Sequence, residues 1–553
     1  MVVVGGGITG CGVALEAVAR GLRTALVEAG DLASGTSSRS SKLVHGGLRY
    51  LSQGDFGLVR EALGERQRLL VNAPHLVRPL PFLVPLFGRD GVAARSVARG
   101  YSSALWLYDA SGGVRIGHRH RRVGPADALA HQPSLRIDTL VASFLYWDAQ
   151  ADDARLTLAV ARTAALRGAV VVTRAAVTGM VSRPGGRVGG VVLADGTEVR
   201  ARAVVNAAGV WAGDVGSLPG AGPRDAAGLR PAKGVHLSVP ADRLPCDWAA
   251  VLSVPGESRT VFVAPWDAQA AGAPGGVGRF TYVGTTDTDY EGDLAEPLCS
   301  AADRDGLLDA VNAWTGAGLT PADVTATWAG LRPLVAGEAR ARSADLSRRH
   351  RVEVAPSGLV SVTGGKLTTY RKMASDALDA VAGLLGGAPA GRRSATARLP
   401  LAGAAGWERV EPRGPLLADP ALHRHLVGRH GTEATAVAAL CGEDPGLAEP
   451  LVPGLPYLRA EAVWAARREM ATTLDDVLSR RTRALLLDRE ATVSAAPEVA
   501  QLLAAELGWD DDRSGRELDA LLAAVQRERR ALGEVPPPAR QPPGRPGRTG
   551  AAR

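Results

Sequence analysis

The first ten residues place the strongest constraint on what this chain can fold into. A β-branched run at residues 2–4 leads into the turn GGGITG at residues 5–10, and an apolar-periodic segment follows at residues 13–19. Residues 24–27 have the pattern of a second strand, and Glu28 comes directly after it. The order strand, glycine turn, helix, strand and acid predicts a dinucleotide-binding βαβ unit.

Each residue of this pattern has a physical reason. Gly5 allows the tight turn, Gly7 lets the backbone approach a pyrophosphate, and Gly10 lets the helix and the strand pack closely. The start of the helix offers N–H groups and positive potential to the phosphates. Glu28 stands 18 residues after Gly10 and is placed to accept a hydrogen bond from a ribose hydroxyl.

The glycine pattern favours FAD over a nicotinamide cofactor. An enzyme that reduces flavin with NAD(P)H is expected to carry a second fingerprint in its own βαβ context, and the sequence shows none. Instead, single glycine turns follow β-rich runs at Gly209 and at Gly364. We therefore expect one extended FAD that takes electrons directly from the substrate.

Length and periodicity predict several domains. A chain of 553 residues corresponds to two to four domains. Its middle is predicted to be rich in strands, at residues 169–172, 188–193, 199–206, 235–239, 260–263 and 280–284. Helical patterns dominate after about residue 390, and Ser514 with Glu517 has the spacing of a capping box. The Pro-, Gly- and Arg-rich residues 536–553 are predicted to be disordered.

Charge and cysteine content exclude several classes of protein. The net charge of +7 is modest for this length, and no nucleic-acid partner is expected. Four separated cysteines predict neither a disulfide framework nor a metal site. No apolar stretch is long enough for a transmembrane helix, and no signal peptide is evident. We expect a cytoplasmic protein that is soluble or lies on a membrane surface.

Lysine usage marks four positions. Only Lys42, Lys233, Lys366 and Lys372 are lysines among the 64 basic residues. A position that keeps lysine in such an arginine-rich chain is a candidate for one that needs a compact ammonium.

Seven segments together resemble the FAD-dependent glycerol-3-phosphate dehydrogenases. They are GGGITGCG, TSSRSSKLVHGGLRYL, WDAQADDARL, NAAGVWA, VGTTDTDY, GLRPL and TGGKLTTYRK, in the same order and with similar spacing. The likeness extends from residue 2 to about residue 530. It implies a non-covalent FAD, sn-glycerol 3-phosphate as substrate, hydride transfer to the flavin, and a quinone acceptor. Relatives carry several residues before the first strand, so the true start is expected to lie upstream.

The resemblance also implies the fold class. We expect an α/β protein with a Rossmann-like FAD-binding domain, an inserted β-sheet substrate domain and a C-terminal helical domain. The expected division, in chain order, is FAD-binding domain 1–70, substrate- or membrane-facing segment 71–150, FAD-binding domain 151–225, substrate-binding sheet 226–335, FAD-binding domain 336–390, and helical domain 391–535.

Substrate residues follow from the motifs HGGLRY, GLRPL and GGKLTTYRK. By resemblance, Arg49 and Arg332 form a phosphate clamp, and planar guanidinium groups suit a phosphomonoester dianion. Tyr50 and Lys366 are expected to add a hydroxyl and an ammonium. Further cofactor contacts are expected from the same glycine-rich motifs, at Ser41, Lys42, Gly46, Gly47, Gly209, Gly364, Leu367 and Thr368.

His45 is the candidate general base, because histidine has the unperturbed pKa nearest neutrality. In the alternative, His45 only holds flavin or substrate, and Lys366 or Arg332 polarises the substrate hydroxyl. Lys42 is expected near the flavin, with a surface loop position as its alternative. Lys233 and residues 285–287 are expected to line the substrate cavity without taking part in a chemical step.

A membrane surface is the remaining expected partner. Val97, Tyr101, Leu105 and Tyr108 form an amphipathic-looking stripe, and a basic run follows at residues 115–122. Apolar and aromatic residues beside cations suit the inner face of the cell membrane, from which quinone could enter.

Three rivals stay open. One is an oxidase that passes the electrons to oxygen, and another is a flavin amine or hydroxy-acid oxidase of similar architecture. The third is a flavin-binding protein without activity whose C-terminal helices recruit a partner. A homodimer is also left open.

Overall fold

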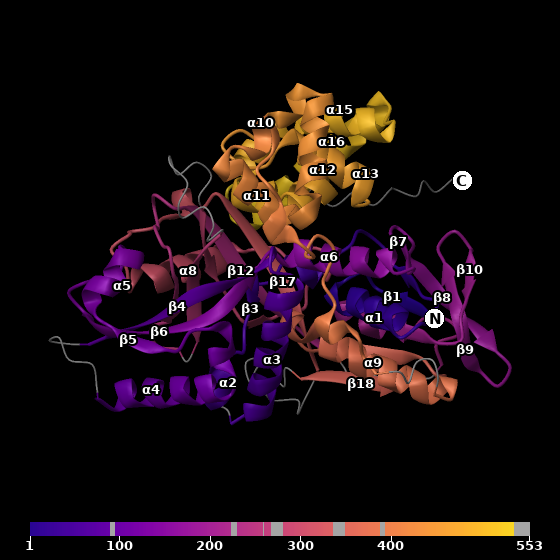
Figure 1. The fold of residues 1–553 in the computed structure, drawn as a ribbon, viewed down its shortest axis with the longest axis horizontal. Coiled ribbons are helices and arrows are strands. Elements are labelled where there is room, and N and C mark those ends of the chain that lie inside the picture. The colour runs from indigo at the N-terminus through magenta and orange to yellow at the C-terminus, as the bar shows by residue number, and fades with distance from the viewer. Residues whose placement is uncertain are drawn as a thin grey trace, which may run out of the picture.

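The computed structural model describes residues 1–52, 54–88, 95–222, 229–257, 259–266, 280–335, 349–387 and 393–535. The predicted disordered tail lies outside these ranges. Within them the chain forms two large sheets, one small sheet and a layer of C-terminal helices (Figure 1). The predicted α/β class with a C-terminal helical domain is confirmed.

A six-stranded sheet surrounds the N-terminal βαβ unit. Its order is β18-β19-β11-β1-β2-β7, all parallel except the edge strand β18. The strands are β1 (Val2–Val4), β2 (Ala25–Val27), β7 (Val170–Val172), β11 (Val204–Asn206), β18 (His350–Val354) and β19 (Val360–Gly364). Helix α1 (Ile8–Ala19) packs against α6 (Asp153–Leu166) and α9 (Tyr370–Leu385). Central strands covered by helices are apolar throughout, as the buried valines of β1 illustrate.

The single strand predicted at residues 199–206 is in fact two strands in different sheets. β10 (Glu198–Arg200) belongs to a three-stranded antiparallel sheet with β8 (Val177–Arg183) and β9 (Arg187–Leu193). β11 begins at Val204 and joins the six-stranded sheet. Both strands are β-rich, so composition does not reveal the crossing between them.

The larger sheet contains the remaining strands and begins before the segment predicted to hold it. Its main path is β16-β12-β15-β14-β13-β4-β6-β3, with β17 paired to β12 and β5 paired to β6. The strands are β3 (Leu43–Val44), β4 (Val77–Phe87), β5 (Arg121–Val123), β6 (Leu140–Ala151), β12 (Leu229–Pro240), β13 (Ala249–Ser253), β14 (Thr260–Pro265), β15 (Phe280–Gly284), β16 (Thr288–Asp289) and β17 (Ala326–Val335).

Helices cover these sheets and form the C-terminal layer. Around the sheets lie α2 (Arg49–Ser52), α3 (Phe56–Asn72), α4 (Arg95–Ala110), α5 (Pro125–His131), α7 (Ala212–Val215) and α8 (Ala301–Asn312). The C-terminal layer contains α10 (Gly414–Leu417), α11 (Pro420–His430), α12 (Ala434–Glu443), α13 (Arg459–Arg468), a π-helical segment (Asp476–Arg481), α14 (Ala484–Leu487), α15 (Arg489–Leu507) and α16 (Asp511–Ala531). None of the helices described is long and apolar enough to cross a bilayer.

The capping box predicted at Ser514 is wrong. Helix α16 starts one turn earlier, where the Asp510 side chain accepts a hydrogen bond from the Arg513 N–H. Aspartate is as good an N-cap as serine, and the acidic residues Asp511 and Asp512 favour the same helix start electrostatically.

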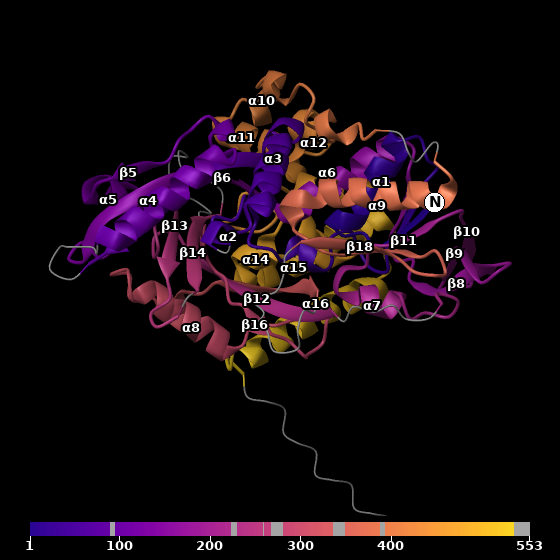
Figure 2. The same ribbon diagram turned by 90° about the horizontal axis from the view of Figure 1, so that it is seen from below.

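The apolar stripe of helix α4 that was predicted to contact a membrane instead packs against the rest of the protein. Leu105 and Tyr108 are fully buried, Tyr101 is half-buried, and the side chain of Val97 lies outside the described part. The exposed apolar residues of this helix are instead Trp106 and Leu107, at 63% and 47% exposure. Figure 2 shows α4 lying along one edge of the molecule beside α2.

Three glycines set how closely α1 approaches its neighbours. A Cβ at Gly10 would lie 1.9 Å from the Gly5 carbonyl oxygen, and one at Gly12 would lie 2.6 Å from the Tyr370 ring. Gly5 has a φ of +109°, and a Cβ there would lie 2.7 Å from the Ala207 carbonyl oxygen. The turn between β1 and α1 therefore accepts only glycine at these contacts.

We expect Gly10→Ala to destabilise the protein although alanine is the better helix former. The added methyl group overpacks the turn, which lowers the free energy of unfolding by roughly 1–3 kcal/mol. Gly383→Ala in α9 is the control, because a Cβ there meets nothing within 4 Å. Thermal unfolding followed by circular dichroism measures both variants. A Gly10→Ala midpoint that rises as much as that of the control would contradict this packing.

Candidate flavin and substrate site

Glu28, the acidic residue after β2, is hydrogen-bonded to the glycine turn. Glu28 accepts hydrogen bonds from the Gly6 N–H at 2.5 Å and the Gly30 N–H at 2.8 Å. Burial raises the pKa of Glu28, although both backbone donors oppose the shift. The carboxylate is thus fixed beside the start of α1 by the backbone.

A single cavity joins this turn to the predicted substrate residues. Its volume is about 1720 Å³, above the roughly 300–1,000 Å³ of a typical pocket for a drug-sized ligand. It therefore has room for a dinucleotide and a small substrate together. The predicted site residues that line it are Gly5, Gly7, Glu28, Ser41, His45, Gly47, Tyr50, Gly209, Arg332, Gly364, Lys366, Leu367 and Thr368.

Arg332 is held rigidly at the wall of this cavity by the loop after β15. Its Nη1 lies 3.3 Å from the Asp287 Oδ1, and its Nη2 donates to the Thr285 hydroxyl at 3.1 Å and the Thr286 carbonyl at 3.2 Å. Residues 285–287 line the cavity, as predicted for them. The guanidinium group is therefore fixed by three neighbours before any ligand binds.

Lys366 and Tyr50 contact each other beside Gly47. The Lys366 Nζ lies 3.9 Å from the centroid of the Tyr50 ring, a cation–π contact. Gly47 has a φ of +81°, and a Cβ there would lie 2.4 Å from the Tyr50 ring and 3.3 Å from the Lys366 Nζ. Arg49 begins α2, but its side chain lies outside what the structure describes.

A buried carboxylate positions the loop that carries His45. The His45 N–H donates to the Thr368 hydroxyl at 3.3 Å. The next N–H, of Gly46, donates to the Tyr108 hydroxyl at 3.0 Å and to Asp148 at 3.3 Å. Asp148 also accepts from Tyr108 at 2.5 Å, and burial raises the pKa of this carboxyl. Gly46 thus anchors the loop and is not among the cavity-lining residues.

His236 lines the cavity and was not predicted from the sequence. It stacks on Trp328 with ring centroids 4.9 Å apart, and its Nε2 lies 2.9 Å from the Ser41 hydroxyl. Burial, with Lys42 and Arg332 nearby, lowers its pKa well below the ordinary value. The motif RPAKGVH contains it, but nothing in that motif separates it from other histidines in strands.

Two predicted lysines do not reach the cavity. Lys42 is buried behind its wall, where its Nζ lies 3.0 Å from Asp153 and over the Trp328 ring. Burial lowers the pKa of Lys42 to about 8, with a further contribution from Arg483. The surface alternative for Lys42 is therefore wrong. Lys233 pairs with Asp303 at 2.6 Å and is absent from the cavity lining.

Comparison with known proteins decides the family. The model of the FAD-dependent oxidoreductases matches residues 1–371, and that of the C-terminal domain of alpha-glycerophosphate oxidase matches residues 394–514. The chain is 44% identical to glycerol-3-phosphate dehydrogenase 2 of Mycobacterium tuberculosis over 540 residues, which cover 96% of this chain and 88% of that one. The chain belongs to the FAD-dependent glycerol-3-phosphate dehydrogenase family.

Other members of this family agree. The mitochondrial glycerol-3-phosphate dehydrogenase of Macaca fascicularis is 34% identical over 551 residues, covering 94% of this chain and 72% of that protein. The structure of the glycerol-3-phosphate dehydrogenase from Bacillus halodurans, complexed with FAD, superposes with a TM-score of 0.73 at 30% identity. That superposition covers 95% of this chain and 94% of that chain.

FAD is the cofactor of this family, and the residues of this dehydrogenase fit it. The start of α1 and the glycine turn suit a pyrophosphate, because side chains are sterically excluded at Gly5 and Gly10. Glu28 faces the same cavity in the position of the ribose-binding acid. The cavity then continues past Gly209 and Thr368 to His45, Arg332 and Lys366.

Proposed function

We propose that this protein oxidises sn-glycerol 3-phosphate to dihydroxyacetone phosphate and passes the electrons to a quinone. The observation that carries the proposal is one cavity that joins a dinucleotide turn to Arg332, Lys366 and His45. Bound FAD supplies the two-electron oxidant that the polypeptide lacks. The relatives named for glycerol 3-phosphate, at up to 44% identity, support the substrate.

Arg332 and Lys366 bind and orient the substrate in this proposal, with Arg49 as the second arm of the phosphate clamp. A guanidinium group that is already fixed by Asp287, Thr285 and Thr286 loses little side-chain entropy when it binds a phosphate. Lys366, held over Tyr50, adds a compact charge to the same cavity. The reacting end of the substrate is then placed by binding at its non-reacting phosphate.

His45 is the base that removes the hydroxyl proton in this proposal. The cavity contains a second histidine, His236, whose Nε2 already lies 2.9 Å from the Ser41 hydroxyl. Its strongly lowered pKa makes it a weak proton acceptor at neutral pH. His45 stands in a loop fixed at Gly46 by Asp148, close to Thr368. In the alternative, Lys366 or Arg332 polarises the hydroxyl, and loss of the His45 imidazole then leaves the rate of flavin reduction close to that of wild type.

An apolar wall of the same cavity favours a quinone acceptor. Its residues share an aromatic or aliphatic character and come from α4, β4, β6, β13 and β14: Tyr101, Ala104, Val84, Tyr146, Val251 and Phe262. Glycerol phosphate is polar and charged and would not bind to such a surface, whereas the apolar ring and tail of an isoprenoid quinone would. An oxidase needs only access for oxygen and gives no reason for an apolar wall of this extent.

The outer face of α4 is the proposed membrane contact. Trp106 and Leu107 are exposed on it, and Val114 is exposed just beyond its end. Arginines close to them in the sequence, at residues 99, 115, 119, 121 and 122, are also exposed. Aromatic and aliphatic side chains among cations suit an anionic membrane surface, and this supports the proposed attachment to the cytoplasmic side of the cell membrane.

Wild-type protein should oxidise glycerol 3-phosphate with a long-chain quinone in anionic vesicles, and Trp106→Glu should lower that rate. Turnover with a water-soluble quinone analogue should be unchanged in the variant, because the cavity is intact. Leu522→Glu on α16 is the control, since Leu522 is also exposed but lies on another face. Equal vesicle-dependent rates in all three proteins would exclude this membrane contact. Stoichiometric peroxide without quinone reduction would identify an oxidase.

Arg332→Ala should raise the KM for glycerol 3-phosphate and leave FAD content intact. Loss of a charge-assisted contact to the phosphate corresponds to roughly a 10- to 150-fold change. Arg332→Lys should recover part of it, because charge remains but the fork is lost. The control is Arg243→Ala, which removes a surface partner of Asp323 in the same sheet region. Steady-state kinetics with a soluble acceptor would contradict the clamp if the KM stayed at the wild-type value.

His45→Asn should slow flavin reduction by about 10²–10⁴-fold and keep FAD and substrate binding. In wild type this rate should rise with pH through one ionisation, because only neutral imidazole accepts the proton. Anaerobic stopped-flow reduction at saturating glycerol 3-phosphate measures both effects, with His423→Asn in the C-terminal layer as the control. A variant within a few-fold of wild type and with the same pH profile would transfer the role to Lys366 or Arg332.

A further inference from the structure

A short run of arginines in the C-terminal layer contacts segments that form the cavity. Arg480 and Arg481 end the π-helical segment, and Arg483 precedes α14. All three are buried, at 6%, 3% and 0% exposure. They belong to the helical layer that lies above the two large sheets in Figure 1. Three buried guanidinium groups within four residues require specific partners. Some of these partners lie in the C-terminal layer itself, such as Asp475 and Asp476, which pair with Arg480. The others lie beside the cavity.

The first partner is Asp31, which follows Glu28 by three residues. Asp31 accepts from the Arg480 Nε at 2.6 Å and from the Arg481 Nη1 and Nη2 at 2.7 and 2.8 Å. These two arginines lower the pKa of Asp31 to about 2 against the effect of its burial. The same loop is tied to the glycine turn, because the Ala33 N–H donates to the Gly6 carbonyl at 3.0 Å. The arginines therefore fix the loop that presents Glu28 to the cavity.

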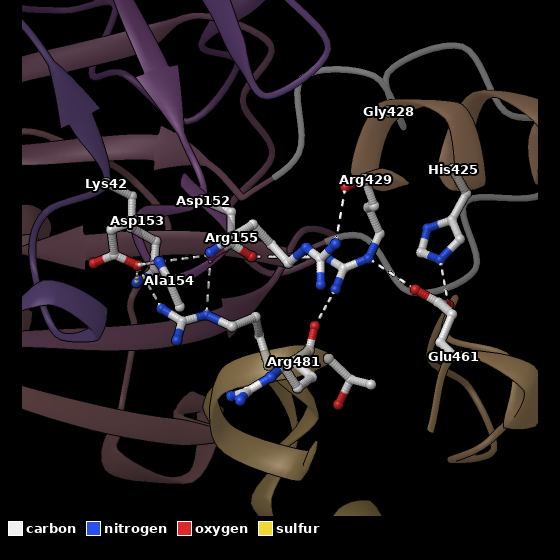
Figure 3. Close-up of polar contacts among 12 residues, drawn as sticks. Lys42, Asp152, Asp153, Ala154, Arg155, His425, Gly428, Arg429, Glu461 and Arg481 are labelled. Atoms are coloured by element: carbon white, nitrogen blue, oxygen red, sulfur yellow. Dashed lines mark hydrogen bonds and ion pairs between the residues drawn. The ribbon is translucent and has the colours of Figure 1, made fainter. Parts of the chain in front are cut away.

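The second pair of partners lies at the other end of the site. The Arg483 Nη2 donates to the Ser38 carbonyl and to the Asp153 Oδ1, each at 2.6 Å. Asp153 in turn accepts from the Ser40 N–H at 2.9 Å and the Ser40 hydroxyl at 2.7 Å. Figure 3 shows Asp153 facing Lys42, whose Nζ lies 3.0 Å away. Ser40 and the next residue, Ser41, line the cavity.

A second layer of ion pairs holds the arginine run in place. Arg429 donates to Glu461 at 2.9 Å and to the Arg481 carbonyl, which joins α11 to α13 and to the run (Figure 3). Arg155 on α6 pairs with Glu469 at 2.6 Å. Because these charges are buried and balanced, removing one partner leaves another uncompensated, so the geometry of the run is strongly specified.

We propose that residues 480–483 position both ends of the flavin site, through Asp31 at the adenosine end and through Ser38 and Asp153 at the substrate end. Arg481 and Arg483 are positioning residues, since they act through loops that line the cavity. The C-terminal layer is then part of the cofactor site, in contrast to a module that only recruits a partner. The inference rests on the proposed function only for its kinetic readout.

Replacing Arg481 or Arg483 singly by methionine tests the adenosine end and the substrate end of the flavin site separately. Arg481→Met should raise the FAD dissociation constant by roughly 10- to 150-fold, the scale of one lost charge-assisted contact. The visible spectrum and the KM of its FAD-loaded form should match wild type. Arg483→Met should shift the visible spectrum of bound FAD and raise the KM for glycerol 3-phosphate, and Arg483→Lys should restore part of both. Arg459→Met is the control, because Arg459 pairs with Glu449 and Glu498 on the surface of the same layer.

The measurements are FAD fluorescence titration, the absorption spectrum, steady-state kinetics per bound flavin, and thermal unfolding. Lower thermal midpoints with unchanged FAD affinity, spectrum and KM would overturn the proposal, because the arginines would then only hold the layer to the fold. If Arg481→Met does not fold, the neutral pair Asp31→Asn with Arg481→Gln replaces it, and normal FAD affinity in that pair would equally overturn the proposal.

Failure of the proposed function gives a different result. The FAD affinity and the spectrum are measured without substrate, so they test the positioning role whatever the enzyme oxidises. A wild-type protein that binds FAD tightly but does not oxidise glycerol 3-phosphate would refute the function alone.

Discussion

The close approach of α1 to its neighbours is the constraint on which the rest of the site depends. Gly10 lies against the carbonyl of Gly5, Gly5 lies against that of Ala207, and Gly12 lies against the Tyr370 ring. These contacts bring together three parts of the chain that are far apart in sequence. The glycine turn, the end of β11 and the start of α9 then form one edge of the cavity, because no side chain separates them.

The four lysines of this arginine-rich chain make different kinds of contact. Lys42 and Lys366 lie over aromatic rings, with their Nζ atoms 4.9 Å from the centroid of Trp328 and 3.9 Å from that of Tyr50. Lys233 forms a largely buried pair with Asp303. Lys372 is different, because it only pairs with Asp376 one turn away on the surface of α9. Nothing in this contact requires a compact ammonium at Lys372, and for the other three lysines the hypothesis drawn from composition stays a prediction.

Local motifs could be predicted from sequence, whereas contacts between distant segments could not. The glycine turn and Glu28 follow each other within one supersecondary unit, so their pattern was sufficient. Strand β4 was missed because its three prolines are typical of loops and sheet edges. His236 and Arg483 act through partners almost 200 and more than 300 residues away. The domain boundaries and the roles of individual site residues remain predictions.

The strand order of the six-stranded sheet has a consequence for how the chain is made. A ribosome releases β1, the glycine turn and β2 first, but β11 and β19, which complete the central parallel pairing, come from residues 204–206 and 360–364. Arg480, Arg481 and Arg483 emerge later still. The nascent N-terminal unit therefore has an open sheet edge and an Asp31 without its two arginine partners during most of synthesis. Such a protein should depend on chaperones that shield exposed strands until translation ends, and truncated chains should be prone to aggregate.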